Sequence, residues 1–159
     1  LVPMVPIVHS AINYAAVADL PGKNLPLFGA PIMRLIDPGK DTLVFMKNAE
    51  PISLYCADES DGESLDSCQQ VLEGLYAYNV DGIAAPALAE ECVANEDLSV
   101  WTCTLREGVK FHDGSDFDAA DVIASWGAGL DASNPNHVGN TGAWDYYAYL
   151  WDSLMNESE

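Results

Sequence analysis

Residues 89–114 read AEECVANEDLSVWTCTLREGVKFHDG, and this stretch decides the fold. Two runs of strand-forming character, 90–93 and 98–105, flank the turn-forming residues 94–97. This order predicts a β-hairpin. The turn pair Asp113-Gly114 is expected to end the extended segment that follows the second strand.

The cysteines fall into two close pairs along the chain: Cys56 and Cys68, then Cys92 and Cys103. No CxxC is present and no gap has zinc-ligand spacing, which argues against a structural zinc site. Of the possible connectivities we expect the local one, because the hairpin places Cys92 and Cys103 on facing strands. Four separate buried thiols are the alternative. Disulfides would indicate an oxidising compartment.

Further elements are predicted on both sides of the hairpin. Apolar residues at helical spacing predict a helix from Ser64 to Tyr76. Asp118 is expected to cap a second helix that runs to Leu130, and the aromatic segment Trp144–Leu154 is expected to be helical. Short strands separated by Pro and Gly turns are expected at 4–9, 13–18, 31–36 and 42–47. The fold class is therefore α/β, in the sense of a mixed α+β unit.

The charge of the chain is strongly negative, with 25 acidic and 6 basic residues among 159 and a net charge of -19. Four acids and four bases lie up to Ala57, so the remaining stretch carries 25 − 4 = 21 acids and 6 − 4 = 2 bases. Such a surface repels phosphate backbones and anionic lipid, so nucleic-acid and peripheral membrane binding are disfavoured. The 49% hydrophobic content indicates a globular chain instead of a charge-driven disordered one. The longest uncharged run, 1–18, is too short and polar to span a bilayer.

No motif in the sequence predicts catalysis, a metal site or a cofactor. In the acidic cluster 58–63, Gly62 at the sixth position of an EF-hand would put Ala57 first and Cys68 twelfth, and neither supplies a carboxylate. His112 and Asp113 fit a turn better than an acid–base pair. No nucleophile elbow, P-loop or dinucleotide fingerprint is present. The aromatic residues after Trp144 could stack on a ligand, but packing is the favoured interpretation. We therefore expect no enzyme activity and no catalytic residues.

Several blocks in fixed order carry a resemblance to a known family. They are LEGLY (72–76), PALAE (86–90), EDLSVWTCTLREGVKFHDG (96–114), DAADV (118–122) and Ser125-Trp126. Together they resemble the N-terminal lobe of family 5 extracellular solute-binding proteins, the peptide, dipeptide and nickel receptors of ABC importers. The resemblance covers roughly residues 42–130. It implies a periplasmic-binding-protein type II-like fold, present as a partial lobe I with short strands and two or three helices.

The resemblance also implies where a solute would bind. The loop after Ser53-Leu54 contributes to the ligand site in this family, and here it holds the candidate ligand-binding residues Glu59, Ser60, Asp61 and Gly62. His137 falls near a second contact loop. The implied partners are a peptide or other small solute, an ABC permease in the membrane, and the missing second lobe of the parent receptor.

The order of the parts differs from the family's order. Residues 1–40 resemble its C-terminal closing segment, whereas residues 41–159 resemble the N-terminal part of lobe I, and we expect the two to form one compact unit. The chain is therefore expected to be a fragment of an extracellular or periplasmic receptor, with membrane tethering through the parent chain left open. The alternative is a disulfide-stapled structural or protein-interaction domain that kept this scaffold and lost ligand capture.

Overall fold

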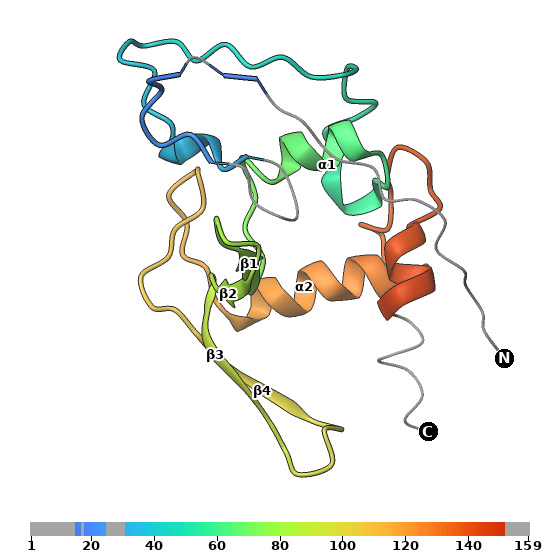
Figure 1. Cartoon of the computed structure of the whole chain (residues 1–159). Helices are drawn as coiled ribbons and strands as arrows, with labels where there is room; N and C mark the ends of the chain where they lie inside the picture. The colour runs from blue at the N-terminus through green and yellow to red at the C-terminus, as the bar shows by residue number, and fades with distance from the viewer. Residues whose placement is uncertain (1–14, 17, 25–30, 152–159) are drawn as a thin grey trace, which may run out of the picture.

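The computed structural model describes residues 15–16, 18–24 and 31–151 (Figure 1). These residues include two α-helices, α1 (Gly62–Cys68) and α2 (Ala119–Leu130). Four strands lie between them: β1 (Tyr76–Tyr78), β2 (Ala84–Pro86), β3 (Ala89–Ala94) and β4 (Trp101–Leu105). Short helical turns complete the described part, namely η1 (Met33–Leu35), η2 (Cys56–Asp58) and the π-helical η3 (Tyr147–Trp151). This small mixed α/β architecture is the predicted fold class.

The predicted hairpin is confirmed as β3 and β4, which pair in antiparallel fashion with Cys92 opposite Cys103. It extends away from the other elements in Figure 1. β4 begins at Trp101 and not at Leu98, because Leu98 has a positive φ of 64° and belongs to the turn. Asn95 closes that turn: its backbone N–H donates to the Val100 carbonyl at 2.9 Å, and its side-chain oxygen accepts from the Val100 N–H at 3.0 Å.

Both local cysteine pairs are disulfide-bonded, as expected. Cys56 is joined to Cys68 and Cys92 to Cys103. The first disulfide ties η2 to the last residue of α1, and the second fastens the two strands of the hairpin at a register pair. Each cross-link therefore stabilises one local unit and not the contact between units.

Helix α2 forms where the sequence predicts it. The Asp118 carboxylate accepts a hydrogen bond from the Ala120 N–H at 2.7 Å, and the Asp121 carboxylate accepts one from the Asp118 N–H at 2.8 Å. This reciprocal capping box satisfies donors that the first helical turn would leave free. The aromatic segment after Trp144 is also helical as far as Trp151, and the rest of the predicted range lies outside the described residues.

Helix α1 is shorter than predicted, ending at Cys68 instead of Tyr76. Two members of the apolar stripe that predicted the longer helix, Val71 and Leu72, are 58% and 57% exposed. Without burial of that stripe, further helical turns gain little stabilisation. Tyr76 instead opens β1, which pairs with β2 in a hairpin that the sequence analysis missed.

The strands predicted before residue 48 are not observed among the described residues. Within the predicted strand 31–36 the chain instead forms η1 (Met33–Leu35), and 42–47 follow an irregular path. The prediction was wrong because β-forming residues need a partner strand, and no described strand lies beside them. The predicted strand 4–9 and most of 13–18 lie outside the described residues.

The Gln70 side chain holds residues 31–33 against the end of α1. Its carbonyl oxygen accepts from the Met33 N–H at 3.1 Å, and its amide donates to the Pro31 carbonyl at 3.2 Å. The N-terminal and later parts of the described chain are therefore in direct contact.

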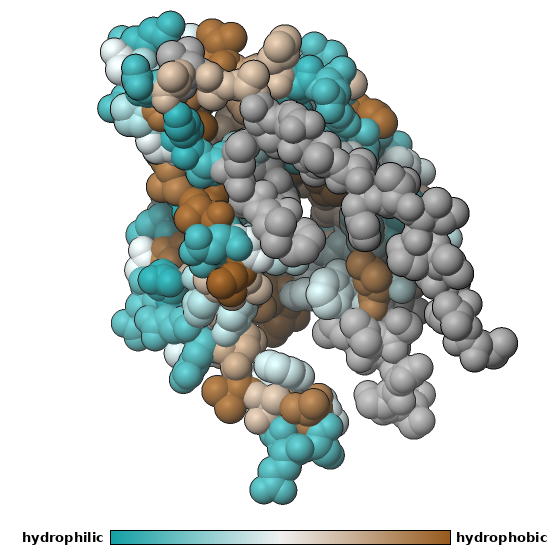
Figure 2. Space-filling view, viewed as in Figure 1, coloured by the Kyte–Doolittle hydropathy of each residue, from teal (hydrophilic) through white to brown (hydrophobic). Residues whose placement is uncertain are grey.

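Buried side chains are few in the described part of the chain. Cys68, Ala89 and Trp144 are the buried hydrophobic residues there, and Asp58, Glu59 and Ser64 are the buried polar ones. Hydrophobic and hydrophilic surface alternate in Figure 2, including over the projecting hairpin. Of the helices that the structure describes, none has the length and apolar character needed to cross a membrane.

Candidate functional site

A buried polar centre of the described part is Asp58, the last residue of η2, which is only 3% exposed. Its Oδ2 accepts from the backbone N–H groups of Thr141 and Gly142, each at 2.7 Å. Its Oδ1 accepts from the Thr141 hydroxyl and the Trp144 N–H, each at 2.8 Å. A buried carboxylate with both oxygens saturated in this way fastens the loop 139–144 to η2.

The pKa of Asp58 reflects two opposing effects. Burial disfavours the charged form and would raise the pKa, but the Thr141 hydroxyl and the N–H groups of Trp144, Gly142 and Thr141 stabilise the carboxylate. The hydrogen bonds together outweigh burial, so the pKa lies below its ordinary value of 3.8. Asp58 is therefore ionised at neutral pH and acts as a fixed anionic anchor.

Gly139 allows the loop to approach this carboxylate. A Cβ placed on Gly139 would lie 2.2 Å from Asp58 Oδ2 and 2.5 Å from its Cβ. Contacts this short force a shift of the backbone or of Asp58, so a side chain at position 139 is incompatible with the observed hydrogen bonds between Asp58 and this loop. We use the term Asp58 latch for Asp58 together with residues 139–144.

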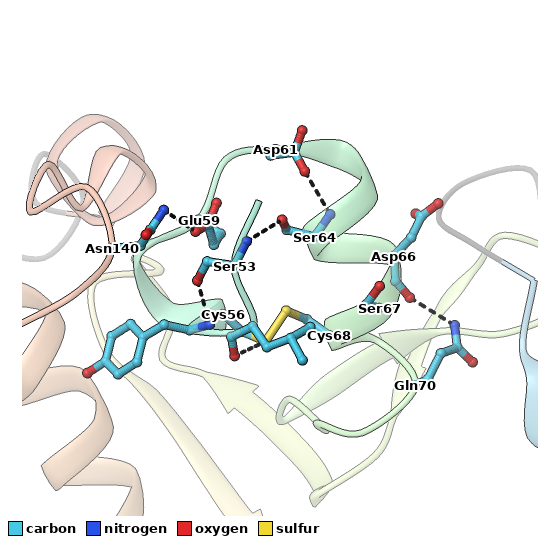
Figure 3. Close-up of a disulfide and its surroundings, with 12 residues drawn as sticks. Ser53, Cys56, Glu59, Asp61, Ser64, Asp66, Ser67, Cys68, Gln70 and Asn140 are labelled. Carbon is cyan, nitrogen blue, oxygen red and sulfur yellow. Dashed lines mark hydrogen bonds between the residues drawn. A yellow bond between two sulfur atoms is a disulfide. The ribbon is translucent and has the colours of Figure 1, made fainter. Parts of the chain in front are cut away.

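The four predicted loop residues follow Asp58 directly and have different environments, and Figure 3 shows two of them, Glu59 and Asp61. Glu59 is 5% exposed and its Oε1 accepts from the Asn140 amide at 3.1 Å. Ser60 is exposed. Asp61 is the N-cap of α1, with its Oδ2 accepting from the Ser64 N–H at 2.8 Å, and Gly62 is the first helical residue.

The capping role explains the electrostatics of Asp61. The Ser64 backbone N–H and the Ser64 hydroxyl stabilise its ionised form and hold its pKa below the ordinary value. Ser64 itself is fully buried, and its hydroxyl oxygen also accepts from the Ile52 N–H at 2.9 Å. The loop is thus held at both ends, by the cap on one side and by the Asp58 latch on the other.

His137 contacts the Asp58 latch through Trp144. Its imidazole stacks on the Trp144 indole with ring centroids 4.6 Å apart and an interplanar angle of 21°. Its Nδ1 is 2.7 Å from the Ala128 carbonyl oxygen of α2. Trp144 also meets Tyr55 edge-on at 6.2 Å, and a pocket of about 210 Å³ is lined by Trp144, Tyr147 and the end of α2.

The structure therefore brings the two predicted contact regions together around one loop. Asn140 contacts Glu59, and Trp144 contacts His137, although His137 follows the 59–62 loop by more than seventy positions in the sequence. Sequence reasoning missed Asp58, Asn140, Thr141 and Trp144 as parts of this region. The available signal was the Gly139-Asn140-Thr141-Gly142 tetrapeptide, whose exposed backbone donors suit a carboxylate, but nothing in the sequence paired it with residue 58.

The arrangement suits binding better than chemistry. Among the residues that the structure describes, no three His, Cys, Asp or Glu side chains come together as a metal site would require. The buried polar groups here are hydrogen-bonded to one another, whereas Ser60 and Gly62 of the loop are exposed and Asp61 is half-buried, as in a rigid scaffold that displays a contact loop.

Part of this region is similar to a known protein family. Residues 84–150 match the family model described as bacterial extracellular solute-binding proteins, family 5 Middle. The match runs from β2 to η3 and includes the hairpin, α2 and the Asp58-binding loop. The resemblance to family 5 is therefore confirmed for this part of the chain, and proteins of this family are binding receptors, not enzymes.

Individual relatives agree with this class. The chain is 33% identical to the oligopeptide-binding protein OppA of Bacillus subtilis over 96 residues, which is 60% of this chain and 18% of that protein. It is 42% identical to the glutathione-binding protein GsiB of Salmonella paratyphi A over 83 residues, 51% of this chain and 15% of that protein. It is 33% identical to the nickel-binding periplasmic protein of Escherichia coli over 102 residues, which is 63% of this chain and 18% of that protein.

The chain spans less than a fifth of the length of each of these three relatives. No solved structure gives a significant match to the chain.

Proposed function

We propose that this chain is the first-lobe part of an extracytoplasmic solute-binding receptor of an ABC importer, with an oligopeptide- or dipeptide-type solute. The single observation that supports this most is the joining of the 59–62 loop and His137 through residues 140–144, inside or beside the segment that matches family 5. Two predicted contact regions that share one rigid support can face one solute. Extracellular or periplasmic placement goes with this proposal, as does a further lobe in the parent chain.

The proposed mechanism is capture without chemistry. The solute settles against the contact loop, the missing second lobe closes over it by hinge motion, and the closed receptor docks on a membrane permease. Ser60 supplies an exposed hydroxyl, and the carboxylates of Glu59 and Asp61 give the loop a negative potential suited to the ammonium group of a peptide. His137, stacked on Trp144, provides the second contact.

Calorimetry on the parent receptor tests this function. Titration with a mixture of short peptides should give saturable heat, and Ser60→Trp should weaken that binding by at least about tenfold, equivalent to roughly 1.4 kcal/mol. Glu107→Trp is the control, since position 107 is also exposed but lies in the turn after β4. The proposal fails if the parent gives no heat with peptides or with nickel, or if both tryptophan variants bind like the parent.

The alternative, an interaction domain without solute capture, is favoured by one observation. The projecting β3–β4 hairpin exposes apolar side chains, with Val93 56%, Val100 57% and Trp101 62% exposed. Exposed apolar groups on a cross-linked hairpin suit contact with another protein. Absence of solute heat together with loss of a protein partner in Trp101→Ser would support this second function.

A further inference from the structure

A further cavity of the described part lies apart from the contact loop. It is an open groove of about 570 Å³ between η1, the residues that follow α1, and the β1–β2 hairpin. Its lining includes two arginines, two tyrosines and one acid: Arg34, Arg106, Tyr76, Tyr78 and Glu73. A volume of this order is in the range of small-molecule sites.

The charge of this groove differs from that of the molecule as a whole. The chain has only two arginines among its 6 basic residues, and both line this groove, although 25 acids are distributed along the sequence. Only one ion pair joins two residues that the structure describes, and it is between Lys110 and Asp116. Within the described part, therefore, neither arginine is engaged by any of the many carboxylates.

Arg106 is held in a fixed orientation. Its Nε–H donates to the Ala87 carbonyl at 2.9 Å, while its backbone N–H donates to the Leu88 carbonyl at 2.9 Å. A guanidinium that uses only its Nε–H retains its terminal nitrogens for another acceptor. Arg34 stands in the last turn of η1 and makes no hydrogen bond or ion pair with a residue that the structure describes.

We propose that the groove between Arg34 and Arg106 binds a small organic carboxylate with an aromatic or apolar body. The guanidinium fork matches a carboxylate in a bidentate geometry, and the rings of Tyr76 and Tyr78 provide an apolar wall for the rest of the molecule. Glu73 lines the same groove and repels a second negative charge, which favours a monoanion. The net charge of -19 likewise disfavours polyanions such as nucleic acid.

This site is independent of the solute site proposed around residues 59–62. Its lining contains none of Glu59, Ser60, Asp61, Gly62 and His137. The two sites can therefore be tested separately on the same chain, and failure of one leaves the other standing.

The test compares benzoate with its neutral isostere benzamide by NMR titration of the whole 159-residue chain. Benzoate should cause saturable shifts of the Arg106 Nε–Hε signal and of the Tyr76 and Tyr78 ring signals, and benzamide should bind roughly tenfold more weakly or not at all. Equal affinity for the two compounds, no shift with benzoate, or shifts confined to residues outside the groove would overturn the proposal.

Variants distinguish the arginines from general charge. Arg34→Gln should weaken benzoate binding roughly tenfold without unfolding the chain, since Arg34 has no hydrogen bond to another described residue. Lys40→Gln removes the same charge outside the groove and should leave affinity unchanged. Arg106→Lys keeps the charge but loses the fork, so it too should weaken binding. Equal effects of Arg34→Gln and Lys40→Gln would show a general charge effect and contradict the site.

Discussion

At the scale of single residues, Asp58 makes the most consequential contacts. It accepts hydrogen bonds from residues 83, 84 and 86 positions further along the chain. A carboxylate used in this way joins segments that no disulfide joins, because each cross-link spans only 12 or 11 positions. Loss of Asp58 should therefore affect the whole described unit and not only η2.

Asp58→Ala is expected to lower the free energy of unfolding by roughly 3 kcal/mol, since it leaves the backbone N–H donors of Thr141, Gly142 and the buried Trp144 without their acceptor. Urea denaturation followed by tryptophan fluorescence measures the change. Asp116→Ala is a control, because Asp116 is exposed and its carboxylate forms a surface ion pair with Lys110. Equal midpoints for the two variants would contradict the role assigned to the latch.

The stability of the chain should also depend on pH through Asp58. Its folded-state pKa lies below the ordinary value of 3.8 that it regains on unfolding. A depressed pKa contributes stability that is fully present above the unfolded-state value and is lost as the pH falls through the folded-state value. Between about pH 5 and pH 2 the wild type should therefore lose more unfolding free energy than Asp58→Asn.

Denaturation at a series of pH values checks this difference. Subtracting the unfolding free energy of Asp58→Asn from that of the wild type at each pH removes the contributions of other acids. These include Asp66, whose pKa is raised by burial. Parallel pH profiles for the two proteins would show that Asp58 is not the group responsible.

At the scale of elements, aspartates repeatedly form turns. Asp97, Asp113 and Asp131 each accept, through Oδ1, from the backbone N–H and the hydroxyl of the serine two residues later. These contacts lower the pKa of all three. Part of the acidity of the chain is thus accounted for by turn formation after β3, after residue 111 and after α2.

Two glycines of α2 should respond in opposite ways to the same substitution. A Cβ on Gly129 would lie 2.1 Å from Cε1 of Tyr147, whereas one on Gly127 would meet only Asn134 Nδ2 at 3.8 Å. Gly127→Ala should therefore stabilise the chain by up to about 1 kcal/mol through helix propensity, and Gly129→Ala should destabilise it. Thermal unfolding of both variants measures this, and a gain for Gly129→Ala would contradict the packing of Tyr147 on α2.

The parts predicted correctly from sequence were those with local causes. The β3–β4 hairpin, the Asp118 cap and the two disulfides each depend on residues within about a dozen positions, where propensity and spacing carry the information. The strands predicted within residues 31–47 were wrong because a strand requires a distant partner. The helix predicted from Ser64 to Tyr76 was too long because Val71 and Leu72 remain exposed. For the site, the ligand-binding role of the 59–62 loop stays a prediction. The contacts of Asn140 with Glu59 and of Trp144 with His137 are long-range features of the fold that sequence spacing does not encode.

At the scale of the whole molecule, the net charge of -19 acts on every element at once. Self-repulsion among exposed acids opposes the compact state and is screened by salt over a Debye length of about 10 Å at 0.1 M. The melting temperature should therefore rise as sodium chloride is increased from about 0.02 M to about 0.5 M. Differential scanning calorimetry measures the trend.

A charge-reduced variant separates screening from other salt effects. Glu90, Glu96 and Glu107 are exposed, so changing all three to Gln should raise the melting temperature at low salt and reduce its dependence on salt. An unchanged salt dependence in this variant would indicate that repulsion among these acids is not the cause.

The two disulfides join cysteines that are consecutive in the sequence, Cys56 to Cys68 and Cys92 to Cys103. A chain that enters an oxidising compartment N-terminus first presents them in that same order, so pairing each cysteine with the next one to arrive gives the native bonds. We therefore expect the oxidation of these four cysteines to be independent of a disulfide isomerase. Both bonds can close before residues 139–144 have emerged, which leaves the Asp58 latch to assemble last on units that are already cross-linked.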